Sequence, residues 1–195
     1  MEVDPLPPKV RIGREMIVEA AFEIARESGV EGVNARAVAR RLNCSTQPVM
    51  YHFGSIEALK RAVYARADRF HSAYLLRARG GEACAPLEIG MNYIRFAMEE
   101  PRLFRLLFQS GHAGGNSLAE LMDSPELAPL LSAMQPAMGL RMPQVKRAFL
   151  TIALFAHGYA SLLSNNALAF DEAQAADHLS RAFRGAVLAA REEEA

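Results

Sequence analysis

Cysteine is scarce in this chain of 195 residues, which contains only Cys44 and Cys84. Two cysteines cannot form a disulfide framework, and free thiols suit the reducing interior of a cell. The amino terminus has neither the basic nor the apolar segment of a secretion signal. Long apolar runs are also lacking, because the longest candidate, residues 148–163, falls short of the roughly 18–20 residues of a membrane span. We therefore expect a soluble, cytoplasmic protein that does not enter a membrane.

Motifs of catalysis and metal binding are missing as well. No two histidines are four residues apart, and the sequence contains no Cys-x-x-Cys. Neither the Gly-x-Ser-x-Gly motif of a nucleophilic serine nor a phosphate-binding loop occurs. We expect no metal ion, no cofactor and no enzymatic activity.

What the sequence does contain is helical periodicity. Apolar residues recur at helical spacing from Gly13 onwards, and no segment shows the alternation of a β-strand. The predicted fold class is all-α. In the first third, Ser28-Gly29 ends a helix, while Asn34, Ser45 and Ser55 are candidate N-caps of the next three, the last of which continues to about Arg79.

Further helices are expected at about 86–99, 102–109, 118–138, 144–166 and 172–190, separated by proline- and glycine-containing breaks. Residues 1–9, with three prolines, are expected to form a disordered arm.

The net charge of zero conceals an uneven distribution along the chain. Residues 34–79 contain nine Lys and Arg against two acids, whereas residues 80–195 contain nine bases and thirteen acids. A basic head before an acidic body indicates that one end meets a polyanion. An unevenly charged but ordinary solvated surface is the alternative, which charge alone leaves open.

Two short helices joined by a tight turn and preceded by a supporting helix form a helix-turn-helix arrangement. In such a pair the second helix enters the major groove of DNA. Val49 and Phe53, four residues apart, are expected to face inward. Polar side chains suited to phosphate or base contacts occupy the two helices and the turn between them: Arg36, Ser45, Thr46, Gln47, Tyr51 and His52. The alternative reading is an ordinary polar helical surface.

Residues 13–60 resemble the DNA-binding domain of the tetracycline-repressor (TetR) family. The runs IVEAAFEIA from Ile17 and VARRLNCSTQPVMYHFGSIEAL from Val38 carry the resemblance. It implies a helix-turn-helix domain at residues 10–58, followed by an effector-binding and dimerisation domain at 59–195. It also implies a homodimer that binds a palindromic operator in double-stranded DNA, with the same six residues as DNA contacts. A small apolar effector bound in the second domain is expected to release the operator, as in a repressor.

Two positions depart from the family pattern. Met50 stands where the family has a tyrosine, and Ile56 where it has a lysine at the start of the long helix. Lys60 or Arg61, one turn further on, is expected to supply the missing cation. The departures predict weaker nonspecific affinity for DNA.

Aromatic and methionine residues gather in the middle helices, and such residues form adaptable apolar pockets. The candidate effector contacts are Phe70, Tyr74, Tyr93, Phe96, Phe104, Phe108, Met122 and His157. Residues at helical spacing are also what an ordinary core contains, and His157 fits a satisfied core histidine as well. The pair His157-Gly158 resembles the penultimate helix of a subset of the family.

Small residues mark the last two helices, at 151–161 and 182–189, and permit close helix approach. Together with neighbouring Leu154, Leu162, Phe183, Val187 and Leu188 they predict a four-helix dimer interface, with packing inside one chain as the alternative. A small helical ligand carrier or enzyme with an incidental basic head is the rival to a regulator.

Overall fold

The computed structural model describes residues 12–77, 86–110, 122–166 and 168–192, and these residues form helices, turns and loops without a strand. The all-α prediction is confirmed. The chain divides into an N-terminal unit, Met1–Ala67, and a C-terminal unit, Asp68–Ala195. The expected disordered arm and the Gly80-Gly81 break lie outside the described residues.

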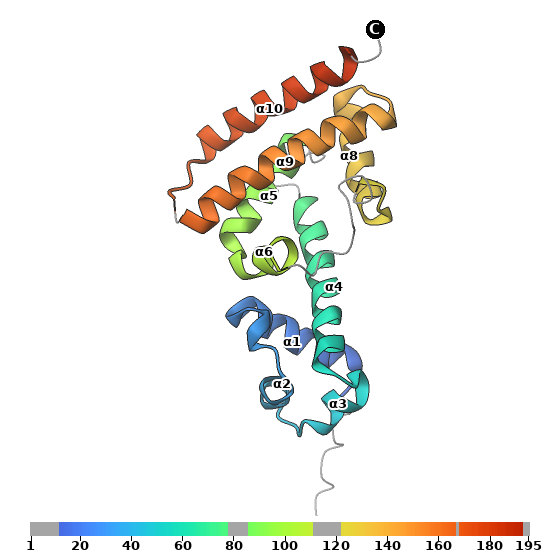
Figure 1. The fold of residues 1–195 in the computed structure, drawn as a ribbon, viewed down its shortest axis with the longest axis vertical. Helices are drawn as coiled ribbons and strands as arrows, with labels where there is room; N and C mark the ends of the chain where they lie inside the picture. The colour runs from blue at the N-terminus through green and yellow to red at the C-terminus, as the bar shows by residue number, and fades with distance from the viewer. Residues whose placement is uncertain (1–11, 78–85, 111–121, 167, 193–195) are drawn as a thin grey trace, which may run out of the picture. The chain divides into compact units, whose positions relative to one another are not determined.

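The N-terminal unit is a small bundle made of α1 (Arg14–Ser28), the short 3-10 helix η1 (Val30–Gly32), α2 (Ala35–Arg41), α3 (Gln47–Phe53) and the first part of α4 (Ile56–Leu75). Helix α1 packs against α2 and α3, which also contact each other (Figure 1). The core is apolar, and its fully buried members include Ile17, Ala21, Val38, Val49 and Leu59. Burial of this apolar stripe stabilises helices that are individually too short to persist in water.

Two of the three predicted caps of these helices are confirmed. The Asn34 side chain accepts a hydrogen bond from the Ala37 amide at 2.9 Å, and Ser55 Oγ accepts one from Ala58 at 3.1 Å. The prediction for Ser45 is wrong, because α3 begins at Gln47 and Thr46 is its N-cap residue without a side-chain bond. Pro48 lies in the first turn, where a missing N–H costs little.

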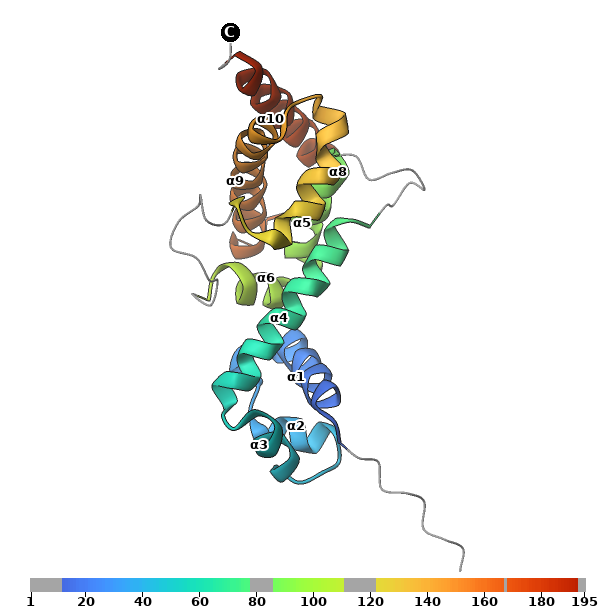
Figure 2. The ribbon, with the colours of Figure 1, turned by 90° about the vertical axis from the view of Figure 1, so that its right-hand side faces the viewer.

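The C-terminal unit contains α5 (Pro86–Glu99), α6 (Pro101–Phe108), η2 (Pro125–Leu127), α8 (Ala128–Met138), α9 (Met142–Asn166) and α10 (Glu172–Glu192). Helix α9 packs against α5, α8 and α10, and α5 also contacts α6 and α10. Figures 1 and 2 show α9 and α10 running side by side. The close approach of α5 to α10 depends on Gly90, where an added Cβ would lie 2.5 Å from Leu179.

Two predicted helix boundaries in this region are wrong. The long helix from Ser55 was expected to reach Arg79, but α4 ends at Leu75. Of the helix expected at 118–138, residues 118–121 lie outside the described residues, and the described part contains the 3-10 turn η2 and then α8 from Ala128. Prolines at 125 and 129 lack the N–H of an interior helical residue and therefore favour new helix starts at these points.

Helix α9 is longer than the apolar run seen in the sequence. Its 25 residues meet the length and composition of a membrane span, which corrects the expectation that no segment is long enough. One such helix is weak evidence for a membrane, and α9 packs against three neighbouring helices. Only 33% of its most apolar window is buried, so one side of this apolar helix faces outward.

Candidate functional site

The turn between α2 and α3 is built by backbone geometry. Asn43 has φ of 51°, a left-handed conformation that asparagine tolerates better than most residues. The Cys44 amide donates to the Ala39 carbonyl at 2.9 Å, which closes the turn. Gly54 ends α3 with φ of 68°, which glycine adopts without strain. Asn43 in the turn before α3 and Gly54 after it therefore permit the chain to change direction sharply on either side of this helix.

Burial separates the two faces of α3. Val49 and Phe53 are buried, as predicted, and hold the helix on its own unit. Tyr51 on the other side is 83% exposed. The other exposed candidates for DNA contact are Arg36 at the start of α2 and Ser45, Thr46 and Gln47 at the start of α3. Hydroxyls, an amide and the free N–H groups of a helix start are thus presented outward together.

His52 and Lys60 are less open than the other candidates. The His52 ring lies 3.2 Å from the Ile12 carbonyl through Nε2, and it is half-buried. One of its two nitrogens is thereby committed within the unit. Lys60 is also half-buried, one turn into α4. Met50, at the position where the family has tyrosine, is 41% exposed beside Tyr51.

Some of the positive charge of this unit is balanced locally. Arg41 forms a two-point ion pair with Glu27. Arg66 pairs with Glu19 at 2.9 Å and stacks over the Phe22 ring at 4.3 Å. These contacts join α2 and α4 to α1, so the two arginines help to hold the unit together. The net positive charge of residues 34–79 therefore overstates the charge available to a polyanion.

A cluster of rings forms in the C-terminal unit around His71, which the sequence reading missed. The His71 ring centroid lies 4.8 Å from Phe96, 5.1 Å from Phe108 and 5.6 Å from Tyr93. His71 is buried, and within the described part of the chain its Nε2 has no hydrogen-bond partner. The signal was present, since Val63, Ala67 and His71 follow one another at four-residue spacing on the buried stripe of α4.

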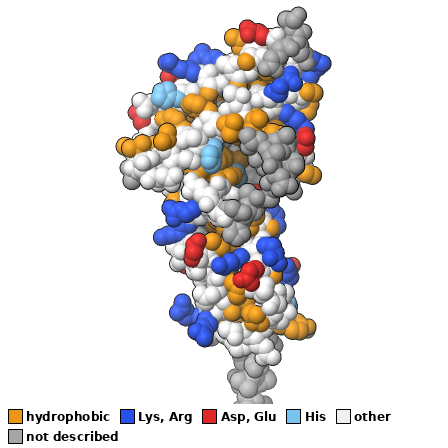
Figure 3. All heavy atoms as spheres, in the orientation of Figure 1, with side chains coloured by type: hydrophobic (Ala, Val, Ile, Leu, Met, Phe, Trp, Pro, Cys, Tyr) orange, Lys and Arg blue, Asp and Glu red, His pale blue; other side chains and the backbone are white. Residues whose placement is uncertain are grey.

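Seven of the eight predicted effector residues make ring contacts in this cluster. Phe70, Tyr74 and Phe96 form one group of ring contacts, and Tyr93, Phe104, Phe108 and His157 form another. His157, which the sequence also allows as a core histidine, is half-buried at the edge of the rings. Met122 is buried in the same unit. Figure 3 shows histidine side chains set among hydrophobic ones on one face of the C-terminal unit.

A second histidine, His157, links the polar side chains of Tyr93 and Ser161 beside the rings. The Tyr93 hydroxyl lies 2.9 Å from His157 Nδ1, and His157 Nε2 lies 3.4 Å from Ser161 Oγ. Burial lowers the pKa of His71 to about 4, lowers the pKa of His157 and raises the pKa of Tyr93. All three side chains are therefore uncharged near neutral pH, and the cluster is an uncharged aromatic environment.

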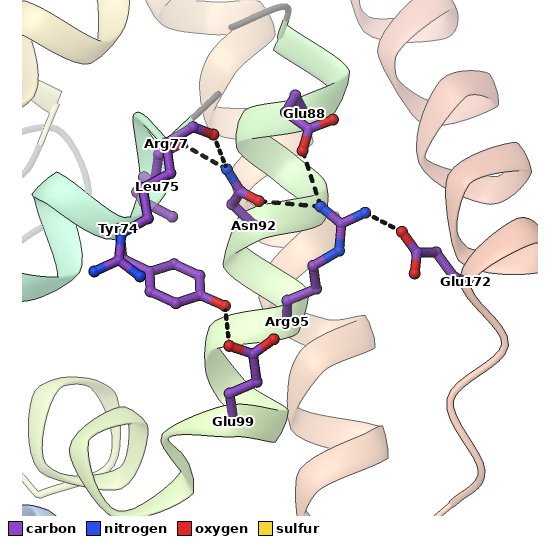
Figure 4. A network of polar contacts seen from close by, with 8 residues as sticks. All are labelled: Tyr74, Leu75, Arg77, Glu88, Asn92, Arg95, Glu99 and Glu172. Atoms are coloured by element: carbon purple, nitrogen blue, oxygen red, sulfur yellow. Dashed lines mark hydrogen bonds and ion pairs between the residues drawn. The ribbon is translucent and has the colours of Figure 1, made fainter. Parts of the chain in front are cut away.

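The end of α4 is fixed by a buried amide (Figure 4). Asn92 of α5 is fully buried, and its Nδ2 donates to the carbonyls of Leu75 at 3.1 Å and Arg77 at 2.9 Å. Its Oδ1 accepts from Arg95, whose guanidinium also pairs with Glu88 and with Glu172 of α10. One side chain thus joins the last turn of α4 to α5, and Arg95 extends that connection to α10.

The predicted dimer surface on α9 and α10 has two faces. Ala156, Ala160 and Ala186 are buried within the unit, so intramolecular packing accounts for these small residues. Leu154, Leu162 and Leu188 are between 51% and 61% exposed. A shallow groove of about 150 Å³ lies between the helices, lined by Arg147, Ala148, Thr151, Gly185, Ala186, Ala189 and Ala190.

Two family patterns match this chain. Residues 17–63 match the family described as "Bacterial regulatory proteins, tetR family", and residues 87–186 match "Tetracyclin repressor-like, C-terminal domain". The chain is 26% identical over 112 residues to the "Uncharacterized HTH-type transcriptional regulator YobS" of Bacillus subtilis (strain 168), covering 55% of this chain and 57% of that protein. It is 30% identical over 70 residues to tetracycline repressor protein class D of Escherichia coli, covering 36% and 32%. The chain therefore spans about half or less of the length of these relatives.

Solved structures share the fold at low identity. A tetR-family transcriptional regulator from Streptomyces coelicolor has a TM-score of 0.66 at 15% identity, covering 92% of this chain and 82% of that one. A TetR variant from Acinetobacter baumannii AYE in complex with minocycline has a TM-score of 0.56 at 13% identity, covering 95% and 99%. The C-terminal pattern alone spans more than half of the 195 residues. On these matches, the chain belongs to the tetR family, whose members are transcriptional regulators and not enzymes.

Proposed function

We propose that this protein is a homodimeric repressor whose α3 helices bind a palindromic operator, and that a small apolar effector in the C-terminal unit releases it. The observation that carries the proposal is the division of α3 into a buried apolar side and an exposed polar side. A helix held this way can enter a major groove while its apolar side keeps it on the unit. The membership of the tetR family supports the same reading.

The proposed DNA contacts are those of the sequence prediction: Arg36, Ser45, Thr46, Gln47, Tyr51, His52 and Lys60. Arg36 and Gln47 are the candidates for base contacts because their planar groups form bidentate bonds with guanine and adenine. Tyr51 is the candidate for a phosphate contact in place of the family tyrosine at Met50. His52 Nε2 donates to the Ile12 carbonyl, so the neutral ring contributes through Nδ1 as an acceptor, for example from a base amino group.

DNA binding is tested by fluorescence anisotropy with a labelled random duplex over a salt series. Neutralisation of phosphates releases counterions, so the logarithm of the binding constant should fall linearly with that of the salt concentration. A ligand carrier with an incidental basic head would show little binding at any salt concentration. That result would overturn the proposal.

The second copy of the chain is proposed to bind on α9 and α10. The exposed leucines and the groove of small residues lie on the same two helices, and a two-fold interface brings the same surface of both copies together. The groove of about 150 Å³ is lined mostly by small residues, so it leaves room for a side chain of the partner.

Gly185→Arg tests this interface. An added Cβ at Gly185 has no atom within 4 Å, so the variant is expected to fold while an unpaired charge enters the seam. Sedimentation should report a monomer, whereas Gln174→Arg, at an exposed position elsewhere on α10, should remain a dimer. A dimeric Gly185→Arg protein would show that the interface lies elsewhere. Ala156, a small residue of α9, is unsuitable for the same test because it is buried within its own unit.

Helix α4 is the proposed link between effector and operator. Leu59 and Val63 are fully buried in the N-terminal unit, while His71 and Tyr74 are buried in the C-terminal unit. An effector that shifts α4 would change the spacing of two recognition helices, which must match half-sites roughly 34–36 Å apart. A difference in effector affinity of about 1–3 kcal/mol between the two states suffices for a switch.

Thermodynamic reciprocity provides the test of the link. Operator DNA must weaken effector binding by the same factor by which the effector weakens operator binding. Titration calorimetry of the effector, with and without a saturating operator duplex, measures that factor. Equal effector affinity in both titrations would contradict this mechanism.

A further inference from the structure

The uncharged ring cluster around His71 favours one chemical class of ligand. Three rings surround the imidazole in edge-on contacts, and such contacts favour further aromatic groups over aliphatic ones. Phe108 is the outermost of the three, at 37% exposed, and His157 is half-buried beside it. Phe108 is therefore the exposed ring beside which a planar molecule would approach the other two rings and the buried imidazole.

The polar atoms of the cluster are not equally available. The Tyr93 hydroxyl is engaged with His157, which also contacts Ser161. Within the described residues, His71 Nε2 is the buried side-chain atom that lacks a partner. A buried polar atom left unpaired is costly, and a ligand that supplies the missing hydrogen bond recovers that free energy. A hydroxyl suits this role because it can donate or accept and therefore fits either tautomer of a neutral imidazole.

Charge is disfavoured at the same place. Burial keeps His71, His157 and Tyr93 uncharged near neutral pH, so none of them can balance a carboxylate or an ammonium group. Two charged side chains, Glu99 and Arg77, contact Tyr74. Its hydroxyl donates to Glu99 at 2.6 Å, and the Arg77 guanidinium lies 4.7 Å from its ring centroid (Figure 4).

From this geometry we propose that the effector is an uncharged aromatic molecule carrying a hydroxyl group, which hydrogen-bonds to His71 Nε2 among the rings of Tyr93, Phe96 and Phe108. The inference rests on the proposed function, because it identifies the chemical class that the effector site selects. His71 is then the residue that determines specificity, and the surrounding rings supply most of the apolar contact.

The test compares three probes with one ring skeleton, namely 2-naphthol, naphthalene and 2-naphthoate, by titration calorimetry at pH 7.5 on the full chain. The hydroxyl compound should bind about tenfold more tightly than naphthalene, as expected for a hydrogen bond to an otherwise unpaired buried group. The carboxylate should bind at least about tenfold more weakly than 2-naphthol, because its charge is desolvated without a counter-charge. Absence of binding by all three, or tightest binding by 2-naphthoate, would overturn the inference.

His71→Phe retains a ring and removes the nitrogens. Its affinity for 2-naphthol should fall to that for naphthalene, whose affinity should stay within about twofold of wild type. Ser161→Ala, which removes the contact with His157 Nε2, should leave the ratio of the two affinities unchanged. An unchanged ratio in His71→Phe would contradict the role given to His71.

A measurement on the wild-type protein avoids dependence on the folding of that variant. With ¹⁵N-labelled histidine, 2-naphthol should shift the Nε2 resonance of His71 and naphthalene should not, and equal shifts would overturn the inference. Operator release is measured separately by anisotropy. A chain that prefers 2-naphthol but keeps its operator would refute the proposed release mechanism and leave the ligand class standing.

Discussion

The two units of this protein use polar side chains in opposite ways. In the N-terminal unit they lie outside an apolar core, where Gln47 is exposed and Tyr51 is almost entirely exposed. In the C-terminal unit they lie inside, where Asn92 and His71 are buried among helices and rings. An exposed polar group contributes little to folding but is available to a partner. A buried one affects stability directly, so a substitution in each unit should have a different main effect.

The largest expected effect is in the C-terminal unit, at Asn92. Asn92→Leu removes a donor to two carbonyls and an acceptor for Arg95, while it keeps a similar volume. We expect a loss of about 3 kcal/mol in the free energy of unfolding, because the two backbone carbonyls and the Arg95 guanidinium lose the side chain that forms hydrogen bonds with them. Denaturant unfolding followed by circular dichroism measures it.

The matched change in the N-terminal unit is Gln47→Leu, at an exposed position of α3. Its unfolding free energy should stay within about 0.5 kcal/mol of wild type. Equal losses in the two variants would remove the contrast between the units.

The second expected effect is the pH dependence caused by His71. Burial lowers its folded-state pKa to about 4, below the usual 6.5, so the unfolded chain binds more protons between these values. Stability due to the neutral imidazole is complete above pH 6.5 and is lost as the pH falls towards 4, by up to about 3 kcal/mol. His71→Phe should lack this part of the pH dependence. Parallel stability profiles of the two proteins from pH 7 to 4 would contradict the prediction.

The third effect concerns binding and not stability. Arg36→Ala should weaken operator binding by about 1–3 kcal/mol if the guanidinium contacts a base, and should leave the melting temperature nearly unchanged. Arg26→Ala, an exposed arginine of α1 paired with Glu23, serves as the control of equal charge. Anisotropy titrations on the native operator measure both. An unchanged dissociation constant for Arg36→Ala would exclude this residue from the contact surface.

The smallest effect is expected at the cap of α2. Asn34→Ala removes the acceptor for the Ala37 amide and should cost about 1 kcal/mol of stability. Asn34→Asp, which keeps an acceptor oxygen, should restore most of that loss. A full loss in both variants would show that the amide hydrogen, which Asn34 Nδ2 donates to the Gly32 carbonyl, matters more than the cap.

Local signals carried much of the sequence prediction. The caps at Asn34 and Ser55 and the start of α10 at Glu172 depend on neighbouring residues alone, and the structure confirms them. Ser45 fails because the turn after α2 uses the left-handed Asn43 and delays the start of α3 by one residue. A cap residue is recognisable from the sequence, but the length of the turn before it is not.

Burial that depends on another helix could not be predicted in this way. Ala156 and Gly185 are both small residues of the last two helices, yet one is buried and the other lies on the surface groove. His71 becomes part of a ring cluster only because α5 and α6 place Phe96 and Phe108 against it. The sequence indicates that such helices exist and which faces are apolar, whereas the pairing of faces emerges from tertiary packing.

The outward leucines of α9 and α10 also bear on how the protein responds to its own abundance. A newly made copy carries Leu154, Leu162 and Leu188 uncovered, and exposed apolar side chains of this kind favour association. If two copies must first join, operator occupancy at low abundance rises with the square of the chain concentration. Halving the amount of protein would then reduce occupancy about fourfold, so the regulated genes would respond steeply to the expression level of the regulator.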